Sequence, residues 1–299
     1  MSSEGSFLSR DFFFCDIIIV VKYMQEINNF EDDLKYKLYS NLNKIMHPSI
    51  SKKNISSYKI ILRDDLSLVR VFYPLKVSNL NKVIIYIHGI SSVSGCGNHY
   101  SDICMNIALK TSQLVIAIDY DEHKKYLECL KDIKKCVQFI SSELKNLGID
   151  NDSITLMGDS IGATMAFSVS KMLGSIKRNI LISPILSGKY FEDVNIIKND
   201  KVNTGLINSL RDYYNDSLRF KKNYKDELVF PLLGKEKTNN NILIITASND
   251  YLKDEAYQFS EIHACDVLEI TVGGHGFLKN MSLDIENIFY TKVVDFLEK

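Results

Sequence analysis

Continuous apolar runs alternate with segments of helical periodicity along most of this 299-residue chain. In the helical segments, apolar residues recur three or four positions apart, which is the spacing of one helix face. Apolar runs between helices are typical of a parallel sheet that helices cover on both faces. The pattern predicts strands at Val83–Ile87, Leu114–Ile118, Ile154–Leu156, Asn179–Ile182, Ile242–Ile245 and Val267–Ile270, and helices at about 101–110, 127–144, 161–173, 254–263 and in the last residues up to Leu297.

The region before these strands has a different pattern. Residues 30–46 carry apolar side chains on one side and charges opposite, up to a histidine-proline pair, which indicates an amphipathic helix. Tyr58–Leu62 and Leu68–Phe72 then indicate an antiparallel hairpin at the edge of a sheet. We therefore expect an N-terminal helical or cap segment, residues 1–55, and a main domain, residues 56–299.

A polar segment at about 189–240 interrupts the alternation. It is rich in Asn, Lys and Tyr, and it separates two expected strands by much more than an ordinary connection. Within it, Leu206–Tyr214 has helical spacing. We therefore expect an inserted lid here that forms a helical cap.

Composition narrows the choice of partners. Lys and Arg number 36 against 37 Asp and Glu, so the net charge of −1 gives no long-range field to attract nucleic acid or an anionic membrane. We expect neither as a partner. Six cysteines without a C-x-x-C pair are typical of reduced thiols in the cytosol, so we expect a cytoplasmic protein. The sequence does not indicate an oligomeric state.

Phe12–Val21 is the candidate targeting segment. It is too short to cross a bilayer, which takes ~20 apolar residues, and Asp16 in its middle disfavours a signal sequence. We expect a buried strand or a helix packed on the body of the protein. The alternative is an arm that contacts membranes.

The segment from residue 154 to 164 predicts a catalytic serine. A short apolar strand runs into Gly158-Asp-Ser160-Ile-Gly162 and then into a helix-forming segment. A G-x-S-x-G turn in this setting is typical of a nucleophile elbow, where side chains at the two glycines would collide with the neighbouring strand and helix. We predict that Ser160 is the nucleophile.

An activated serine needs a base within hydrogen-bond reach and an acid that orients the base. In a sheet of this kind the chain order is serine, acid, histidine. Asp250 follows the strand at 242–245, and His275 follows the next strand, so both fall where active-site loops gather. We predict Asp250 as the acid and His275 as the base, since Asp254 better suits the first turn of the following helix.

Acyl transfer also needs N–H donors for the developing oxyanion. The elbow supplies one, the backbone N–H of Ile161. We expect the second from the loop after the strand at 83–87, in which Ile90 is the first choice and Gly89 and Ser91 are the other candidates.

These residues resemble the hormone-sensitive-lipase-like branch of the α/β-hydrolases, a group of carboxylesterases and lipases with a cap over the pocket. The resemblance covers about residues 56–299. It implies an α/β-hydrolase fold, with a mostly parallel central sheet flanked by helices, and it implies the same roles for Ser160, Asp250 and His275. Its motifs are Val69–Pro74, His88-Gly89, Asp119-Tyr120 followed by Glu122-His123, Gly158–Ala163, Leu181–Pro184, Asn249–Glu255 and His275–Phe277.

The chain departs from the family pattern in two places. The family usually has three glycines after the loop histidine, whereas here the second and third are Ile90 and Ser91. A β-branched residue resists positive φ, so the loop cannot copy an all-glycine conformation. In addition, Asp119-Tyr120 runs almost directly into Asp121-Glu-His123, where the family has several more residues, including a proline. This shortens a loop beside the pocket. We expect the shape of the pocket to differ from that of typical members.

Together these features predict a serine hydrolase that cleaves small-molecule carboxylic esters with short to medium acyl groups, such as acetyl esters, through an acyl-enzyme. We expect no metal or organic cofactor, because no histidines or cysteines fall into a ligand-spaced cluster. One alternative is an amide-cleaving relative, such as an arylformamidase-like deformylase. The other is a hydrolase-fold protein that binds its ligand without turnover.

Overall fold

A computed structural model of the chain describes residues 55–61, 68–74, 82–90, 99–146, 149–188 and 226–299. The expected helix at 30–46, the Phe12–Val21 segment and the helical spacing at Leu206–Tyr214 lie outside these residues. The division into an N-terminal segment and a main domain with an inserted lid stays a prediction.

Eight strands form one sheet in the order β1-β2-β4-β3-β5-β6-β7-β8. Neighbouring strands from β4 to β8 are parallel, whereas β1 pairs with β2 and β2 pairs with β4 in antiparallel fashion. The strands are β1 (Ile55–Ile61), β2 (Leu68–Pro74), β3 (Val83–Ile87), β4 (Leu114–Asp119), β5 (Ile154–Asp159), β6 (Arg178–Ile182), β7 (Asn241–Asn249) and β8 (Asp266–Gly274).

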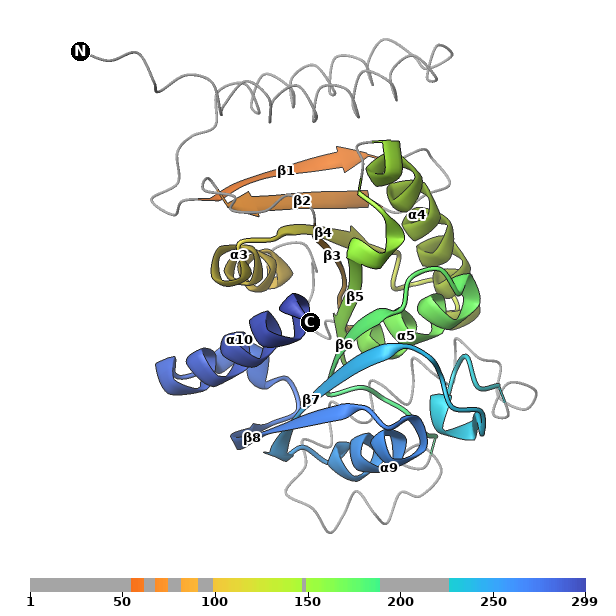
Figure 1. The fold of residues 1–299 in the computed structure, drawn as a ribbon, viewed down its shortest axis with the longest axis vertical. Coiled ribbons are helices and arrows are strands. Elements are labelled where there is room, and N and C mark those ends of the chain that lie inside the picture. Colours follow the sequence, from red (N-terminus) through yellow and green to blue (C-terminus); the bar gives the residue numbers. More distant parts are fainter. Residues whose placement is uncertain (1–54, 62–67, 75–81, 91–98, 147–148, 189–225) are drawn as a thin grey trace.

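Helices cover both faces of this sheet, as Figure 1 shows. The helices α3 (His99–Thr111) and α10 (Leu283–Glu298) pack on one face, and α4 (Tyr126–Asn146), α5 (Ile161–Leu173) and α9 (Lys253–His263) pack on the other. Short 3₁₀ turns lie at Asn151–Ser153, Pro231–Leu233 and Phe277–Asn280. The structure therefore confirms the predicted class of a mostly parallel sheet between two helical layers, with an antiparallel hairpin at its start.

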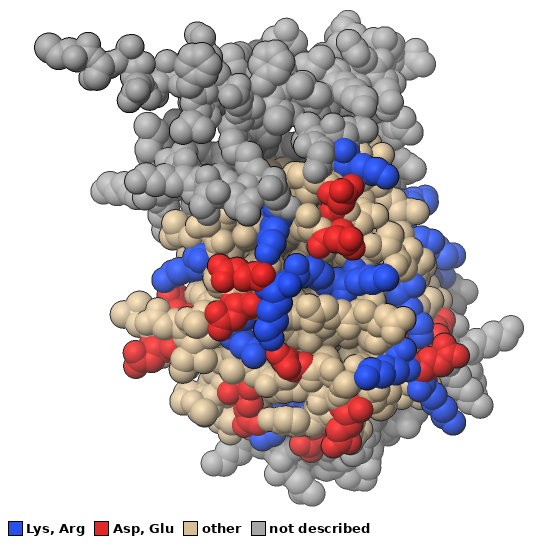
Figure 2. All heavy atoms as spheres, in the orientation of Figure 1, with Lys and Arg blue, Asp and Glu red and all other residues tan. Residues whose placement is uncertain are grey.

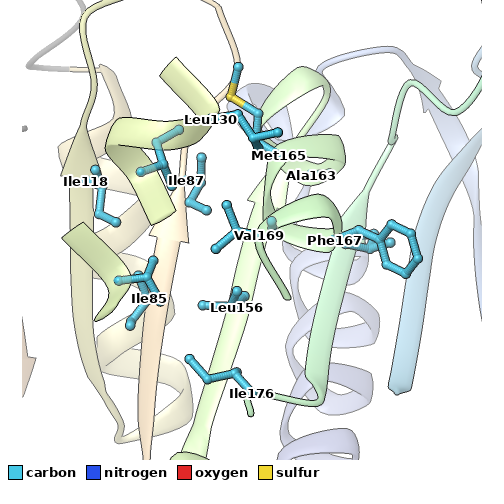
Figure 3. Packing of buried hydrophobic residues seen from close by; sticks show 14 of the residues in the cluster. Ile85, Ile87, Ile118, Leu130, Leu156, Ala163, Met165, Phe167, Val169 and Ile176 are labelled. Atoms are coloured by element: carbon cyan, nitrogen blue, oxygen red, sulfur yellow. The ribbon is translucent and has the colours of Figure 1, made fainter. Parts of the chain in front are cut away.

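Two hydrophobic cores lie between these layers, because successive side chains of a strand point to opposite faces. In β3, Ile85 and Ile87 join the core under α4 and α5, whereas Ile84 and Tyr86 join the core under α3. Figure 3 shows the first core, in which Ile85, Ile87 and Leu156 approach the helical residues Leu130, Ala163 and Val169. Full burial of such a side chain stabilises the fold by about 1.5–3 kcal/mol. The continuous apolar runs of the sequence thus reflect strands that are buried on both sides.

The strands at the end of the chain are longer than the sequence predicts. β7 and β8 stay paired up to Asn249 and Gly274, past a register shift that follows Ala247. These additional residues include polar side chains and glycines, so hydrophobic periodicity cannot detect them. The extension matters because it carries the chain to Asp250 and His275.

The surface carries both signs of charge. Figure 2 shows Lys and Arg interspersed with Asp and Glu over the face that it presents. Cys129 and Cys136 of α4 are buried in the core, as expected of cysteines used as small hydrophobic residues. A membrane-crossing helix is not found in the part of the chain that the structure describes.

Candidate active site

Ser160 occupies the turn between β5 and α5. Its backbone has φ 54° and ψ −125°, a combination that L-residues seldom adopt. The Ser160 N–H donates a hydrogen bond of 2.8 Å to the carbonyl oxygen of Ile182, at the end of β6. Such strain costs about 1–3 kcal/mol and persists only where the surroundings hold it. The turn is therefore fixed by its neighbours, and it presents the serine hydroxyl at the carboxyl edge of the sheet.

Two glycines let this turn approach β3. A Cβ atom on Gly162 would lie 2.3 Å from the carbonyl oxygens of Ile87 and His88. A Cβ atom on Gly158 would lie 2.5 Å from the oxygen of Ile87 and 2.6 Å from that of Gly162. These distances are far below van der Waals contact, so both positions require glycine for the reason that the sequence predicts.

The structure brings together the three residues expected to carry the chemistry. The hydroxyl oxygen of Ser160 lies 2.9 Å from Nε2 of His275. Nδ1 of the same ring lies 3.3 Å from Oδ1 and 3.4 Å from Oδ2 of Asp250. With the proton on Nδ1, the imidazole donates to the carboxylate and Nε2 accepts from the serine. This is the arrangement that a nucleophile and its general base require.

Asp250 is held as an anion behind the histidine. Its side chain is fully buried, and Oδ1 also accepts the N–H of Leu252 at 2.9 Å. Burial alone would raise the pKa of Asp250, but the hydrogen bond and charge of His275, together with the Ser183 hydroxyl and the Leu252 N–H, lower this pKa below its ordinary value of 3.8. Asp250 is therefore ionised at neutral pH and can stabilise an imidazolium.

Ser160 and His275 line a pocket of about 280 Å³. The pocket lies where the carboxyl ends of the parallel strands meet, the usual place for a site in an α/β sheet. Its apolar lining consists of Ile90, Tyr100, Ile103, Ile182, Phe277 and Leu278, and its polar lining also includes Asp159, Ser183 and Lys279.

The oxyanion candidates occupy different environments. Ile161 begins α5 directly after Ser160, and Ile90 lines the pocket. The Gly89 N–H donates to Oδ1 of Asp159 at 3.0 Å, which removes it from the available donors. Ser91 lies outside the described residues. Among the described candidates, Ile90 and Ile161 therefore remain.

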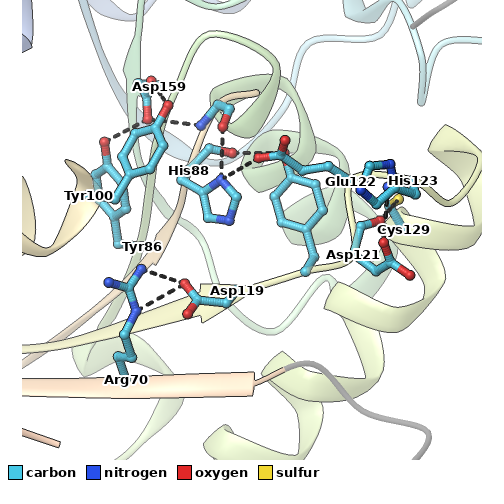
Figure 4. Close-up of polar contacts among 12 residues, drawn as sticks. Arg70, Tyr86, His88, Tyr100, Asp119, Asp121, Glu122, His123, Cys129 and Asp159 are labelled. Carbon is cyan, nitrogen blue, oxygen red and sulfur yellow. Dashed lines mark hydrogen bonds and ion pairs between the residues drawn. The ribbon is translucent and has the colours of Figure 1, made fainter. Parts of the chain in front are cut away.

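The shortened segment after β4 packs behind this loop. The Tyr120 hydroxyl donates to the carbonyl oxygen of His88 at 2.9 Å, and the two rings stack with centroids 4.5 Å apart. Oε1 of Glu122 lies 3.4 Å from Nδ1 of His88. Figure 4 shows Glu122 directed toward the buried His88. The second departure from the family pattern thus places a carboxylate next to the loop histidine.

Sequence reasoning assigned no role to three polar residues of this region. Asp159 holds the Gly89 N–H, and Ser183 lies beside Asp250 with φ 45°. Glu255 of α9 is buried and accepts the N–H groups of Leu186 and Ser187, each at 2.9 Å, so it fixes the chain after β6. All three residues lie inside the motifs of the family resemblance, and that position was their only signal in the sequence.

Within the described ranges, no three His, Cys, Asp or Glu side chains gather in a group that could hold a metal ion.

Comparison with known proteins places this geometry in context. A family model described as alpha/beta hydrolase fold matches residues 84–277. Among curated proteins, the mouse (Mus musculus) arylacetamide deacetylase-like 4 family member 1 is 29% identical over 155 residues, which cover 48% of this chain and 37% of that protein. The chain thus matches well under half the length of this relative.

Solved structures share the fold over most of the chain. The Francisella virulence factor BioJ superposes with a TM-score of 0.71 at 18% identity, covering 92% of this chain and 94% of that one. Brefeldin A esterase, described as a bacterial homologue of human hormone sensitive lipase, gives a TM-score of 0.71 at 16% identity, covering 83% and 78%. These likenesses confirm the predicted hydrolase fold.

The elbow geometry predicts the effect of Gly162→Ala. The new Cβ would overlap two carbonyl oxygens of the β3 end, so we expect a loss of about 1–3 kcal/mol in the free energy of unfolding and slower reaction of Ser160 with a fluorophosphonate. Urea unfolding and labelling rates measure the two effects.

Gly234→Ala is the matched control. There the nearest atom to a new Cβ is Oε2 of Glu227, at the end of a flexible side chain, and φ is −73°. We expect a change within about 0.5 kcal/mol. Equal stability and equal labelling of the two variants would contradict the proposed packing of the elbow.

Proposed function

This chain belongs to the alpha/beta hydrolase fold family, and we propose that it is a serine hydrolase that cleaves carboxylic esters through an acyl-enzyme. The observation that carries the proposal is the 2.9 Å contact between the Ser160 hydroxyl and His275 Nε2, with the buried Asp250 behind the ring. The proposed nucleophile and base thus both line the pocket, and the proposed orienting acid lies behind the base.

In the first half of the reaction, His275 Nε2 takes the hydroxyl proton as Ser160 Oγ attacks the ester carbonyl carbon. The carbonyl oxygen becomes an oxyanion, and Asp250 stabilises the imidazolium. When the tetrahedral intermediate collapses, the bond to the alcohol oxygen breaks, and His275 returns its proton to this leaving group. The acyl group is then bound to Ser160.

Water completes the cycle. His275 Nε2 accepts a proton from a water molecule as its oxygen attacks the acyl carbon. The second tetrahedral intermediate collapses with Ser160 as the leaving group, and the proton on His275 restores the serine hydroxyl. The products are one carboxylic acid and one alcohol, and the enzyme is unchanged.

The N–H groups of Ile161 and Ile90 are the proposed oxyanion donors. Ile161 begins a helix, where the backbone N–H groups have no partner within the helix and the dipole favours negative charge. Loss of one such donor typically costs about 2.7–4 kcal/mol of transition-state stabilisation.

The size of the pocket supports the proposal that the substrates carry short to medium acyl groups. Its volume of about 280 Å³ lies near the lower end of the usual range for small-molecule sites, about 300–1,000 Å³. The apolar residues in its lining suit an alkyl or aryl group rather than a charged one.

Labelling with a fluorophosphonate tests the assignment of the nucleophile. Wild-type protein should bind the probe covalently at Ser160, and Ser160→Ala should lose both labelling and ester turnover, by at least about 10³-fold, since the attacking oxygen is gone. Mass spectrometry locates the adduct. The exposed Ser282, whose side chain makes no capping hydrogen bond, supplies the control variant Ser282→Ala. Labelling that persists in Ser160→Ala would refute the assignment of Ser160 as the nucleophile. Wild-type protein that neither reacts with the probe nor cleaves the ester would favour the ligand-binding alternative.

Amide cleavage is the second candidate function, because the similar mouse protein is named as an arylacetamide deacetylase-like protein. The same three residues could cleave an anilide, provided that His275 protonates the departing amine. Comparison of kcat/KM for phenyl acetate and acetanilide, which share the acyl and aryl groups, separates the two. We expect turnover of the ester to be the faster. A higher kcat/KM for the anilide would reverse the assignment.

A further inference from the structure

The carboxylate of Asp159 joins the nucleophile elbow to the loop that follows β3. Oδ1 accepts the Gly89 N–H at 3.0 Å and the hydroxyl of Tyr86 at 2.7 Å. Oδ2 lies 3.4 Å from the hydroxyl of Tyr100. These donors come from β3, α3 and the loop, and Figure 4 shows Tyr86 and Tyr100 next to Asp159. Asp159 directly precedes Ser160 and shares its pocket.

Gly89 fits closely against this carboxylate. A Cβ atom at Gly89 would lie 2.8 Å from Oδ2 of Asp159 and 3.2 Å from the Cβ of Ser160. Neither Gly89 nor Ile90 is among the described residues with positive φ. Glycine is therefore needed here for close approach to the elbow, and its ability to adopt positive φ is not used.

The other end of the Gly89 residue is fixed as well. Nδ1 of the buried His88 lies 2.8 Å from the Gly89 carbonyl oxygen, so the ring donates to this oxygen with the proton on Nδ1. In a trans peptide the N–H of the next residue points opposite to the carbonyl. With its carbonyl held by His88, the peptide between Gly89 and Ile90 directs the Ile90 N–H to the opposite side.

We propose that Asp159 is a positioning residue, which clamps the oxyanion loop to the elbow so that the Ile90 N–H serves as its donor. The inference rests on the proposed ester hydrolysis. This contact explains how the loop can supply an oxyanion donor although Ile90 replaces a glycine. The Asp159 carboxylate accepts the Gly89 N–H and so holds the loop. The loop backbone then keeps negative φ values, which an isoleucine tolerates.

Charge makes this carboxylate a stronger clamp than a neutral group. Hydrogen bonds to an ionised acceptor are about twice as strong as neutral ones, and Asp159 gathers donors from three separate parts of the chain. A shift of about 1 Å in catalytic geometry can cost about 10²-fold in rate. Loss of the carboxylate should therefore affect the step that uses the oxyanion donor more than it affects substrate binding.

Two variants of Asp159 test this role. Asp159→Ala removes every acceptor, whereas Asp159→Asn keeps the shape and one oxygen that can accept the Gly89 N–H. Each is measured with an aryl acetate and with the matching thionoester, in which sulfur replaces the carbonyl oxygen. Sulfur is a larger and weaker acceptor, so the ratio of the two rates reports how well the donors fit an oxyanion.

We expect Asp159→Ala to lower kcat for the ester by about 10- to 100-fold with KM changed by less than about threefold, and to reduce the ratio of ester to thionoester kcat/KM. Asp159→Asn should lie between this variant and wild type. Asp152→Ala is the control, because it removes an exposed carboxylate at the opposite end of β5 and should leave kcat and the ratio unchanged.

An unchanged ratio in Asp159→Asn, or in folded Asp159→Ala, would overturn the inference even if kcat falls, because a general structural defect lowers both rates together. If the alanine variant does not fold, as seen by circular dichroism, the asparagine variant alone decides. Absence of ester turnover in wild-type protein would instead overturn the proposed function, and the inference with it.

Discussion

The close approach of the β5–α5 turn to the end of β3 is the constraint on which the rest of the site depends. The backbone of Gly162 lies so near the Ile87 and His88 carbonyls that no side chain fits between them. This contact sets the strained backbone of Ser160 and the direction of its hydroxyl. It also places the elbow beside the loop that supplies the second proposed oxyanion donor. One packing contact therefore positions the proposed nucleophile and the proposed oxyanion donors together.

The parallel sheet provides the second condition. Its strands end at one edge, so residues far apart in sequence meet there without a long connecting loop. Asp250 and His275 reach Ser160 because β7 and β8 continue past the register shift after Ala247. The buried Asp250 then keeps its charge, since His275, Ser183 and Leu252 offset the cost of burial and lower its pKa. In this way the fold brings the Asp250 carboxylate, the His275 imidazole and the Ser160 hydroxyl into successive hydrogen-bond contact. Acyl transfer by a serine needs this arrangement.

Most of the architecture could be predicted because local sequence determines it. Apolar runs such as Val83–Ile87 predicted the central strands, and the glycine spacing around Ser160 predicted the elbow. The antiparallel pairing of β2 with β4 was not predicted, since periodicity carries no information on strand order. The contact between Asp159 and Gly89 spans 70 positions of sequence, and no local pattern indicates it. The elbow pattern predicts the role of Ser160, and chain order predicts those of Asp250 and His275. The structure places His275 within hydrogen-bond reach of both other residues.

The proposed mechanism requires a tetrahedral oxyanion that forms on Ser160 beside two backbone donors. A crystal structure of the protein after reaction with a phosphonate ester tests this most directly, because the adduct mimics that intermediate. We expect phosphorus bonded to Ser160 Oγ, with one phosphonyl oxygen about 2.7–3.1 Å from the N–H groups of Ile161 and Ile90 and His275 still hydrogen-bonded to Asp250. An adduct on another residue, or a phosphonyl oxygen turned away from both N–H groups, would contradict it.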